Sequence, residues 1–310
     1  MLHVHRSERA DQLAGALAEL LRAPARDADP FSPEVVAVPA RGVERWLAQH
    51  LSRALGAGGG RADGVCANVA FPSPATLVQE AVAAVTGADP RADVWLPDRL
   101  VWPLLEVLDA CAGEAWCTVL GRHLGMPGAA SGPGGAAGST GDRQRRGRRY
   151  AVARHLAGLF AAYAAARPRM LRAWASGEDT DGGGTPLPAD LAWQAELWRR
   201  LRAHVGAESP AERLDAACEQ LRARPQLLAL PGRLSVFGPT RLTASSLAVL
   251  AAVAEHRDVH LWLPHPSPSL WQRVAQAASG AAAGGRDGGS AVGVEALRRA
   301  DDPAGTGVLR

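Results

Sequence analysis

Two stretches of this chain alternate short apolar strands with amphipathic helices, and a long helical stretch lies between them. In the first stretch, residues 34–39 read EVVAVP, a Val-rich run bounded by Pro that predicts a buried strand. Leu2–His5 and Asn68–Phe71 are further strand candidates. Strands separated by helices of this length favour a parallel sheet, so the sequence predicts an α/β fold.

Between these strands, apolar residues recur at helical spacing in the segments 8–21, 42–55 and 76–85. The second of these predicted helices has an apolar face, which consists of Val43, Trp46, Leu47 and Leu51.

The strand and helix pattern returns near the end of the chain. Segments RLSVF at 233–237 and VHLWL at 259–263 predict strands, and residues 243–255 between them predict a helix that begins at a Thr/Ser segment. The middle of the chain is helical by the same spacing, over the segments 97–112, 115–124, 150–166, 168–175, 191–205 and 211–223.

The predicted organisation is an α/β domain in two pieces with an inserted helical subdomain. Residues 1–124 form the first piece, 227–272 form the second, and 150–226 form the subdomain. The Gly-rich segments 125–149 and 273–310 predict a disordered insertion and a flexible linker at a truncated end.

Composition excludes several kinds of chemistry. All 34 basic residues are Arg, so a P-loop of the type GxxxxGK[ST] is impossible, as is a Schiff-base Lys. The net charge of +3 is weak evidence for a nucleic-acid partner. We expect a cytoplasmic protein with no membrane partner, because the start lacks a signal-peptide core and no apolar run reaches about 18 residues. The four Cys lack CxxC spacing and fit buried thiols in a reducing compartment.

Arg41 and Arg45 are the strongest ligand-binding candidates from local sequence. They follow a predicted parallel strand and lie one turn apart at the start of a helix. That point is the carboxyl end of a strand, where α/β sheets place ligands, and a guanidinium is a planar fork suited to phosphate. Solvated surface Arg residues are the alternative interpretation.

Other polar clusters have a simpler structural interpretation. His3 and His5 alternate on one strand and so share a face, while His260 and His265 flank the end of another. Neither pair belongs to an HExxH or CxxC motif, so ordinary core or solvent histidines are expected. The basic run at 143–149 either binds phosphate or is a solvated charge run.

Five segments, in their order and spacing, resemble the N-terminal part of the exodeoxyribonuclease V gamma subunit family, RecC. These are VAVPARGVERWLAQHLSRALG (Val36–Gly56), NVAFPSPATLV (Asn68–Val78), LAGLFAAYAAARPRMLRAW (Leu156–Trp174), WQAELWRRL (Trp193–Leu201) and FGPTRLTASSLAVLAAVAEHRDVHLWLPHPSPSLW (Phe237–Trp271). None is a catalytic motif. The resemblance covers most of the chain outside the low-complexity segments, and it implies an N-terminal fragment of a longer protein.

The resemblance implies a superfamily 1 helicase-like sheet, related to P-loop NTPases, that has lost its ATPase site. Residues 4–9 read VHRSER where a working relative has a phosphate loop, and they lack its Gly and Lys. Residues 237–240 read FGPT where a Walker B strand would end in acidic residues for Mg²⁺. We therefore expect no catalytic, metal or cofactor residues here, with ATP and Mg²⁺ bound by partner subunits.

In this family the subunit scaffolds two motor subunits, RecB and RecD, helps to split the duplex, and scans a single strand for the hotspot sequence Chi. The resemblance therefore implies RecB-like and RecD-like partners and DNA, both as single strand and as fork. It implies these DNA-binding residues: Arg41, Arg45, Ser73, Gln79, Leu159 and Arg167. Further channel positions carry Pro39, Gly158 and Ala161. Small side chains offer little direct base readout, so sequence-tolerant single-strand binding is expected and Chi scanning stays open.

The predicted function is thus a non-catalytic DNA-handling subunit of exodeoxyribonuclease V (RecBCD) in double-strand break repair by homologous recombination, which guides separated single strands. A stand-alone α/β nucleotide-binding enzyme is an alternative, based on the strand-end Arg pair and the Rossmann-like alternation. An interaction scaffold without DNA contact is the third possibility.

Overall fold

The computed structural model describes residues 1–23, 31–56, 64–111, 113–124, 140–265, 267, 269–273 and 275–276. Its contacts divide the chain into two compact units. Unit 1 comprises residues 1–74, 230–240 and 256–310, and unit 2 comprises residues 75–229 and 241–255. The domain boundaries expected from the sequence stay predictions.

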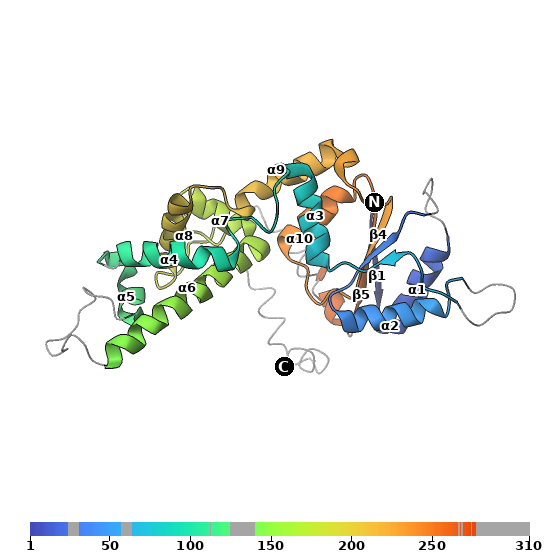
Figure 1. The fold of residues 1–310 in the computed structure, drawn as a ribbon, viewed down its shortest axis with the longest axis horizontal. Coiled ribbons are helices and arrows are strands. Elements are labelled where there is room, and N and C mark those ends of the chain that lie inside the picture. The colour runs from blue at the N-terminus through green and yellow to red at the C-terminus, as the bar shows by residue number, and fades with distance from the viewer. Residues whose placement is uncertain are drawn as a thin grey trace. The chain divides into compact units, whose positions relative to one another are not determined.

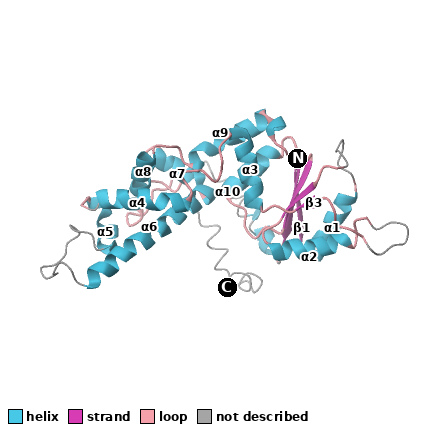
Figure 2. Cartoon of the chain, viewed as in Figure 1, coloured by secondary structure: helices cyan, strands magenta, loops and turns pink. Residues whose placement is uncertain are grey.

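Unit 1 is built on a five-stranded sheet in the order β1-β5-β4-β2-β3, and every pairing in it is parallel. The sheet confirms the predicted α/β class, and its strands lie side by side in Figure 2. The strands are β1 (Leu2–Ser7), β2 (Glu34–Ala37), β3 (Val69–Ala70), β4 (Arg233–Phe237) and β5 (Asp258–Pro264). All five occur where the sequence predicts strands.

Helices α1 (Ala10–Arg22) and α2 (Arg41–Ser52) pack together against one face of this sheet (Figure 1). Leu17 of α1 and Leu47 of α2 are fully buried there, against side chains of β2, β4 and β5 such as Trp262. Burial of each such apolar side chain stabilises the fold by about 1.5–3 kcal/mol. Packing of the apolar face of α2 on the sheet therefore fixes the first turn of α2 relative to the carboxyl end of β2.

An ion pair between a buried Arg and a half-buried Glu joins three elements at the amino edge of the sheet. Arg233 begins β4, is only 7% exposed, and donates two hydrogen bonds to the carboxylate of Glu34 at the start of β2. Its Nη1 also donates to the carbonyl oxygens of Leu20 at 2.8 Å and Ala23 at 3.0 Å. These carbonyls lie at the C-terminal end of α1, where the last turn of a helix lacks backbone donors. Arg233 therefore caps α1 while tying β2 to β4.

Stacked histidines line the junction of β1 and β5. The His260 ring lies 4.5 Å from the His3 ring, and Nδ1 of His260 lies 3.0 Å from Nε2 of His5. The His5 ring in turn stacks on Trp262 at 3.9 Å. His3 and His5 share one face, as predicted. His260 is 6% exposed, and its pKa is lowered to about 4, first by burial and then by the neighbouring His3 and His5.

Unit 2 consists mainly of helices around a core of large aromatic and aliphatic side chains, among them Phe160, Trp174 and Trp198. Its helices are α3 (Pro74–Thr86), α4 (Pro97–Ala110), α5 (Thr118–Leu124), α6 (Thr140–Ala166), α7 (Pro168–Ala175), α8 (Ala192–Val205), α9 (Pro210–Ala223) and α10 (Ala244–Val253). The 3₁₀ turns η1 (Ala115–Cys117) and η2 (Pro225–Leu227) complete it. Among the helices of the described residues, none is both long and apolar enough to cross a membrane.

Local capping explains where two of these helices begin. The Thr243 hydroxyl accepts a hydrogen bond from the backbone N–H of Ser246, which confirms the predicted Thr/Ser start of α10. Ser209 and Glu212 form a capping box at α9.

The start of α6 differs from the prediction. The helix begins at Thr140 instead of Tyr150, so the basic run at 143–149 lies on a helix. The predicted insertion at 125–139 lies outside the described residues, as does most of the linker predicted at 273–310.

Candidate nucleic-acid interface

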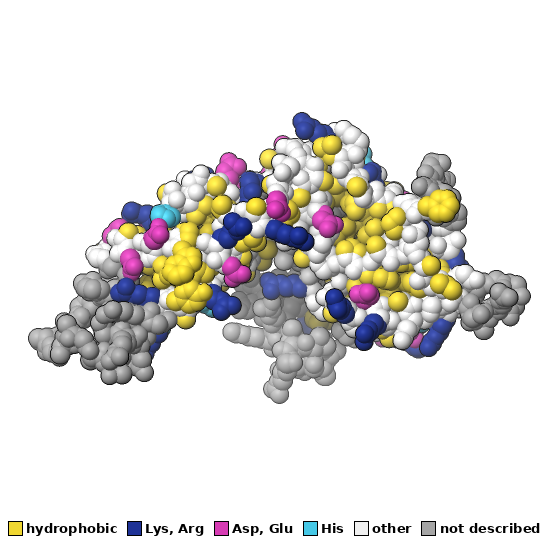
Figure 3. All heavy atoms as spheres, in the orientation of Figure 1, with side chains coloured by type: hydrophobic (Ala, Val, Ile, Leu, Met, Phe, Trp, Pro, Cys, Tyr) yellow, Lys and Arg dark blue, Asp and Glu magenta, His cyan; other side chains and the backbone are white. Residues whose placement is uncertain are grey.

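The carboxyl end of β2 positions the two Arg residues that the sequence singles out. Ala40 has an extended backbone, which turns the chain from β2 into α2, and Arg41 is the first residue of that helix. Arg45 follows one turn later, and both side chains are exposed. Within the described part of the chain, neither guanidinium has an ion pair or a hydrogen bond. Both charges are therefore available to a ligand, and Figure 3 shows basic side chains over α2.

The loops after β2 and β3 are held together at this edge. The backbone N–H of Val38 donates to the carbonyl of Pro72 at 2.9 Å. Ser73 follows directly and is half-buried. The structure thus brings the loop that carries Pro39 beside the loop that carries Ser73, as expected for the ends of neighbouring parallel strands.

Trp46 is a candidate that the sequence analysis missed, because helical spacing groups it with the buried Leu47 and Leu51. In the structure its side chain is 39% exposed. Its ring stacks on that of His50 at 5.5 Å with 28° between the planes, and it lies 6.2 Å from the ring of Phe237. Trp46 is thus at the edge of the apolar face, next to Arg45. An aromatic residue directly after a pair of Arg residues spaced by four is the signal that could have identified it.

The remaining predicted site residues lie in unit 2. Gln79 is exposed on α3, and Arg167 is exposed at the junction of α6 and α7. Leu159 is half-buried and packs against the core of unit 2, so part of its side chain has a structural role. Gly158 is exposed, and Ala161 is half-buried. Their role in DNA binding stays a prediction.

The basic run at 143–149 now lies on α6, and its last residue has a structural partner. Nη1 of Arg149 lies 3.1 Å from Oδ1 of Asp109 on α4. That pair neutralises Arg149, which favours the solvated-charge interpretation for this residue. The phosphate-binding role of the run as a whole stays a prediction.

The described residues contain no group of three or more His, Cys, Asp or Glu side chains arranged to hold a metal ion. All four Cys are free thiols. Burial raises the pKa of the Cys111 thiol to about 11, which keeps it protonated and unreactive at neutral pH.

A cavity of about 350 Å³ in unit 2 could also hold a small ligand. It lies between Trp116 and Trp193, and its charged lining consists of Asp179, Asp190, Glu196 and Arg199. Arg199 is already paired with Asp179 at 2.7 Å and with Glu196 at 3.0 Å. The lining is therefore acidic and disfavours the phosphates of a nucleotide.

Comparison with known proteins places the chain in context. The family described as RecC, N-terminal domain, matches residues 2–291. The RecBCD enzyme subunit RecC of Mycobacterium tuberculosis is 50% identical over 277 residues, which is 88% of this chain and 23% of that protein. The proteins with the same name from Mycolicibacterium smegmatis and Escherichia coli are 46% and 26% identical, and each match covers 22% of the relative. The chain thus spans less than a quarter of the length of these relatives.

Proposed function

Since the chain belongs to the RecC family, we propose that it is the N-terminal part of a non-catalytic, DNA-handling subunit of a RecBCD-type enzyme in DNA repair and recombination. Its partners are then RecB-like and RecD-like subunits and single-stranded DNA. The observation that carries the proposal is the pair of unpaired, exposed guanidiniums of Arg41 and Arg45 at the carboxyl edge of the sheet. Such a pair suits the phosphates of a strand whose sequence is not read.

The parallel sheet is proposed to be that of a helicase-like domain whose motor site has been lost. Only Glu8 and Arg9 separate β1 from α1, which is too short for the loop that wraps a phosphate. Arg9 is also paired with Asp11 on α1. At the end of β4, Phe237 is followed by Gly238 in the left-handed region, with φ of 61°. The next residues, Pro239 to Arg241, have no carboxylate that could hold Mg²⁺.

The purified chain is therefore expected to release no phosphate from ATP above the blank, with or without single-stranded DNA, because it lacks the groups that hold the β- and γ-phosphates and Mg²⁺. A coupled phosphate-release assay measures this, with a RecB-like motor subunit as the positive control. Turnover that survives repurification of the chain would refute the loss of the motor site.

The DNA contact is tested by the salt dependence of binding to a fluorescent oligothymidine, measured by anisotropy. Each phosphate contact to a single strand contributes about 0.7 to the slope of log K against log salt. The double variant Arg41→Ala/Arg45→Ala is expected to make the slope shallower by about 1.4 and to weaken binding at low salt.

A double variant with the same change in net charge is the control for that experiment. Arg91→Ala/Arg224→Ala removes two exposed Arg residues of unit 2, which lie outside α2 and the sheet. It is expected to leave the slope within about 0.3 of the parent value. Equal slopes for both double variants would reject the Arg pair as the contact, and a parent chain that binds no DNA would favour the scaffold without DNA contact.

A further inference from the structure

We propose that Trp46, supported by His50, is a stacking platform for one base of a single strand whose phosphates bind Arg41 and Arg45. The inference rests on the function proposed above and adds a contact to the base.

Two adjacent rows of side chains on α2 make up this surface. Arg41, Arg45 and Gln49 follow one another at intervals of four residues and are all exposed. Trp46 and His50 form the neighbouring row, one position along. Residues four apart on a helix lie on the same face, so the cationic row and the aromatic row run side by side. A strand that follows the first row thus has its bases within reach of the second.

No side chain occupies the helix position one turn before Trp46. Gly42 occupies the position one turn before Trp46, and a Cβ built there meets no atom within 4 Å. Gly42 is also exposed. A flat base can therefore enter beside the indole without displacing a side chain.

The indole is held in place by its own neighbours. One contact is the stacked ring of His50 at 5.5 Å, and a second is the ring of Phe237 in β4 at 6.2 Å. These contacts order the Trp46 side chain before a ligand binds, which lowers the entropy lost on binding. The 39% of Trp46 that is exposed then offers an aromatic surface of the kind on which bases stack regardless of their identity.

Charge argues for a nucleic acid over a protein as the occupant. Burying Arg41 and Arg45 against an apolar protein surface would strip water from two unpaired cations, and this is unfavourable without anionic partners. Phosphates supply those anions, and unpaired bases supply the aromatic partner for Trp46. In a duplex the bases are already stacked on each other, so this surface selects the single strand.

The test is the affinity of the full chain for oligothymidine and for a blunt duplex of equal length, measured by anisotropy. Trp46→Ala is expected to weaken oligothymidine binding about 5- to 150-fold, the range for loss of one stacked base. The salt slope is expected to stay unchanged, because no phosphate contact is lost, and duplex binding is expected to change by less than about twofold. Trp46→Phe keeps an aromatic ring and is expected to retain most of the affinity.

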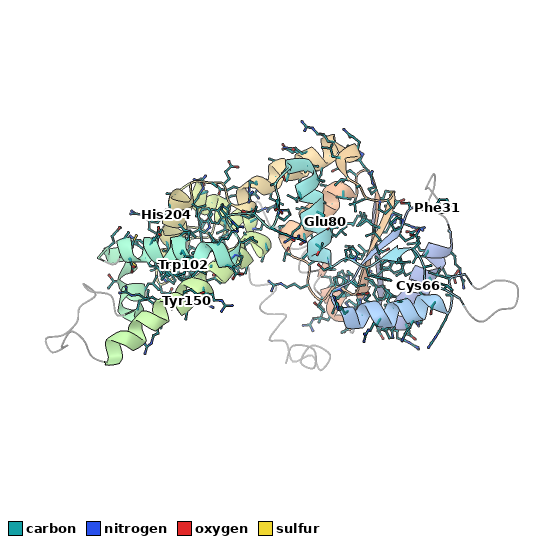
Figure 4. All side chains as sticks on the ribbon, in the orientation of Figure 1. Phe31, Cys66, Glu80, Trp102, Tyr150 and His204 are labelled. Carbon is teal, nitrogen blue, oxygen red and sulfur yellow. The ribbon has the colours of Figure 1, made fainter. Side chains whose placement is uncertain are left out.

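Trp102 provides the matched control, because it is 65% exposed on α4 and packs only against the ring of Tyr150 on α6 among the described aromatic contacts. Figure 4 labels Trp102 and Tyr150. Trp102→Ala is expected to leave oligothymidine binding unchanged. An equal loss for both Ala variants, a loss below twofold for Trp46→Ala, or a shallower salt slope for it would overturn the stacking role.

A second measurement does not depend on the fold of a variant. Photocrosslinking of the unmodified chain to an oligonucleotide with 5-bromouracil is expected to attach the base to Trp46, as located by peptide mass spectrometry. Crosslinks only at other residues would reject the platform while leaving single-strand binding intact. A chain that binds no single strand at all contradicts the proposed function itself, so the two failures are distinct.

Discussion

Replacing Arg233 by Ala is expected to lower the free energy of unfolding by about 2–3 kcal/mol. This is less than the roughly 3–5 kcal/mol for loss of one partner of a fully buried ion pair, because the Glu34 side chain is 27% exposed. The variant leaves the Glu34 carboxylate without its bidentate partner at the start of β2. It also leaves the carbonyls of Leu20 and Ala23 at the end of α1 without their donor. Each acceptor that loses its donor adds to the loss, and water offsets part of it because Ala23 is exposed and Leu20 and Glu34 are half-buried.

Equilibrium unfolding in urea, followed by circular dichroism, measures this loss. The control Arg241→Ala removes an exposed Arg and is expected to change the unfolding free energy by less than about 0.5 kcal/mol. The double variant Arg233→Met/Glu34→Leu is expected to be more stable than Arg233→Ala, because no half-buried carboxylate is left unpaired. A loss below about 1 kcal/mol for Arg233→Ala would mean that solvent reaches the pair.

Lowering the pH from 6.5 to 4 is expected to destabilise the chain by about 3 kcal/mol through His260 alone. Its pKa is about 4 in the folded chain, against an ordinary value of 6.5, so the unfolded chain binds the proton more readily in this window. The stability that neutral His260 contributes is therefore present well above pH 6.5 and is lost as the pH drops through 6.5 towards 4. It levels off only below pH 4, where the folded chain also binds the proton. The pKa of His5 is also lowered by burial, which adds a smaller loss of the same sign.

Urea unfolding at a series of pH values measures this dependence, and His260→Asn is expected to flatten it, because Asn does not titrate. His155→Gln serves as the control, since His155 is exposed on α6 and its removal is expected to leave the dependence unchanged. A parent chain whose stability is constant from pH 7 to pH 4 would contradict the buried, neutral state of His260.

Strands β2 and β4 could be predicted because each is a short apolar run between Pro or Gly residues, and this local signal does not depend on the rest of the fold. Their order could not be predicted. Nothing in the run RLSVF identifies Glu34, which lies 199 positions away, as the partner of Arg233. Pairings of this kind depend on the whole sheet.

The candidate interface was predictable in part for a related reason. Arg41 and Arg45 were found because a strand followed by a helix fixes where the carboxyl edge lies. Trp46 was not found, because neighbouring helix positions lie about 100° apart. An apolar stripe therefore includes residues at its boundary that are only partly buried. Spacing alone groups Trp46 with Leu47, whereas the packing against β4 buries Leu47 and leaves part of Trp46 in solvent.

The order of the strands has a consequence for synthesis of the protein on the ribosome. β1 pairs with β5, and the side chains of His5 and His260, which meet across these two strands, are 255 positions apart. At about 5–20 residues per second, β1 waits roughly ten seconds to a minute for its partner. The helices of unit 2, whose contacts are more local, are made in that interval and can fold first. Until β5 leaves the exit tunnel, both edges of β1 are unpaired, so nascent chains stalled before residue 258 should require a chaperone to stay unaggregated.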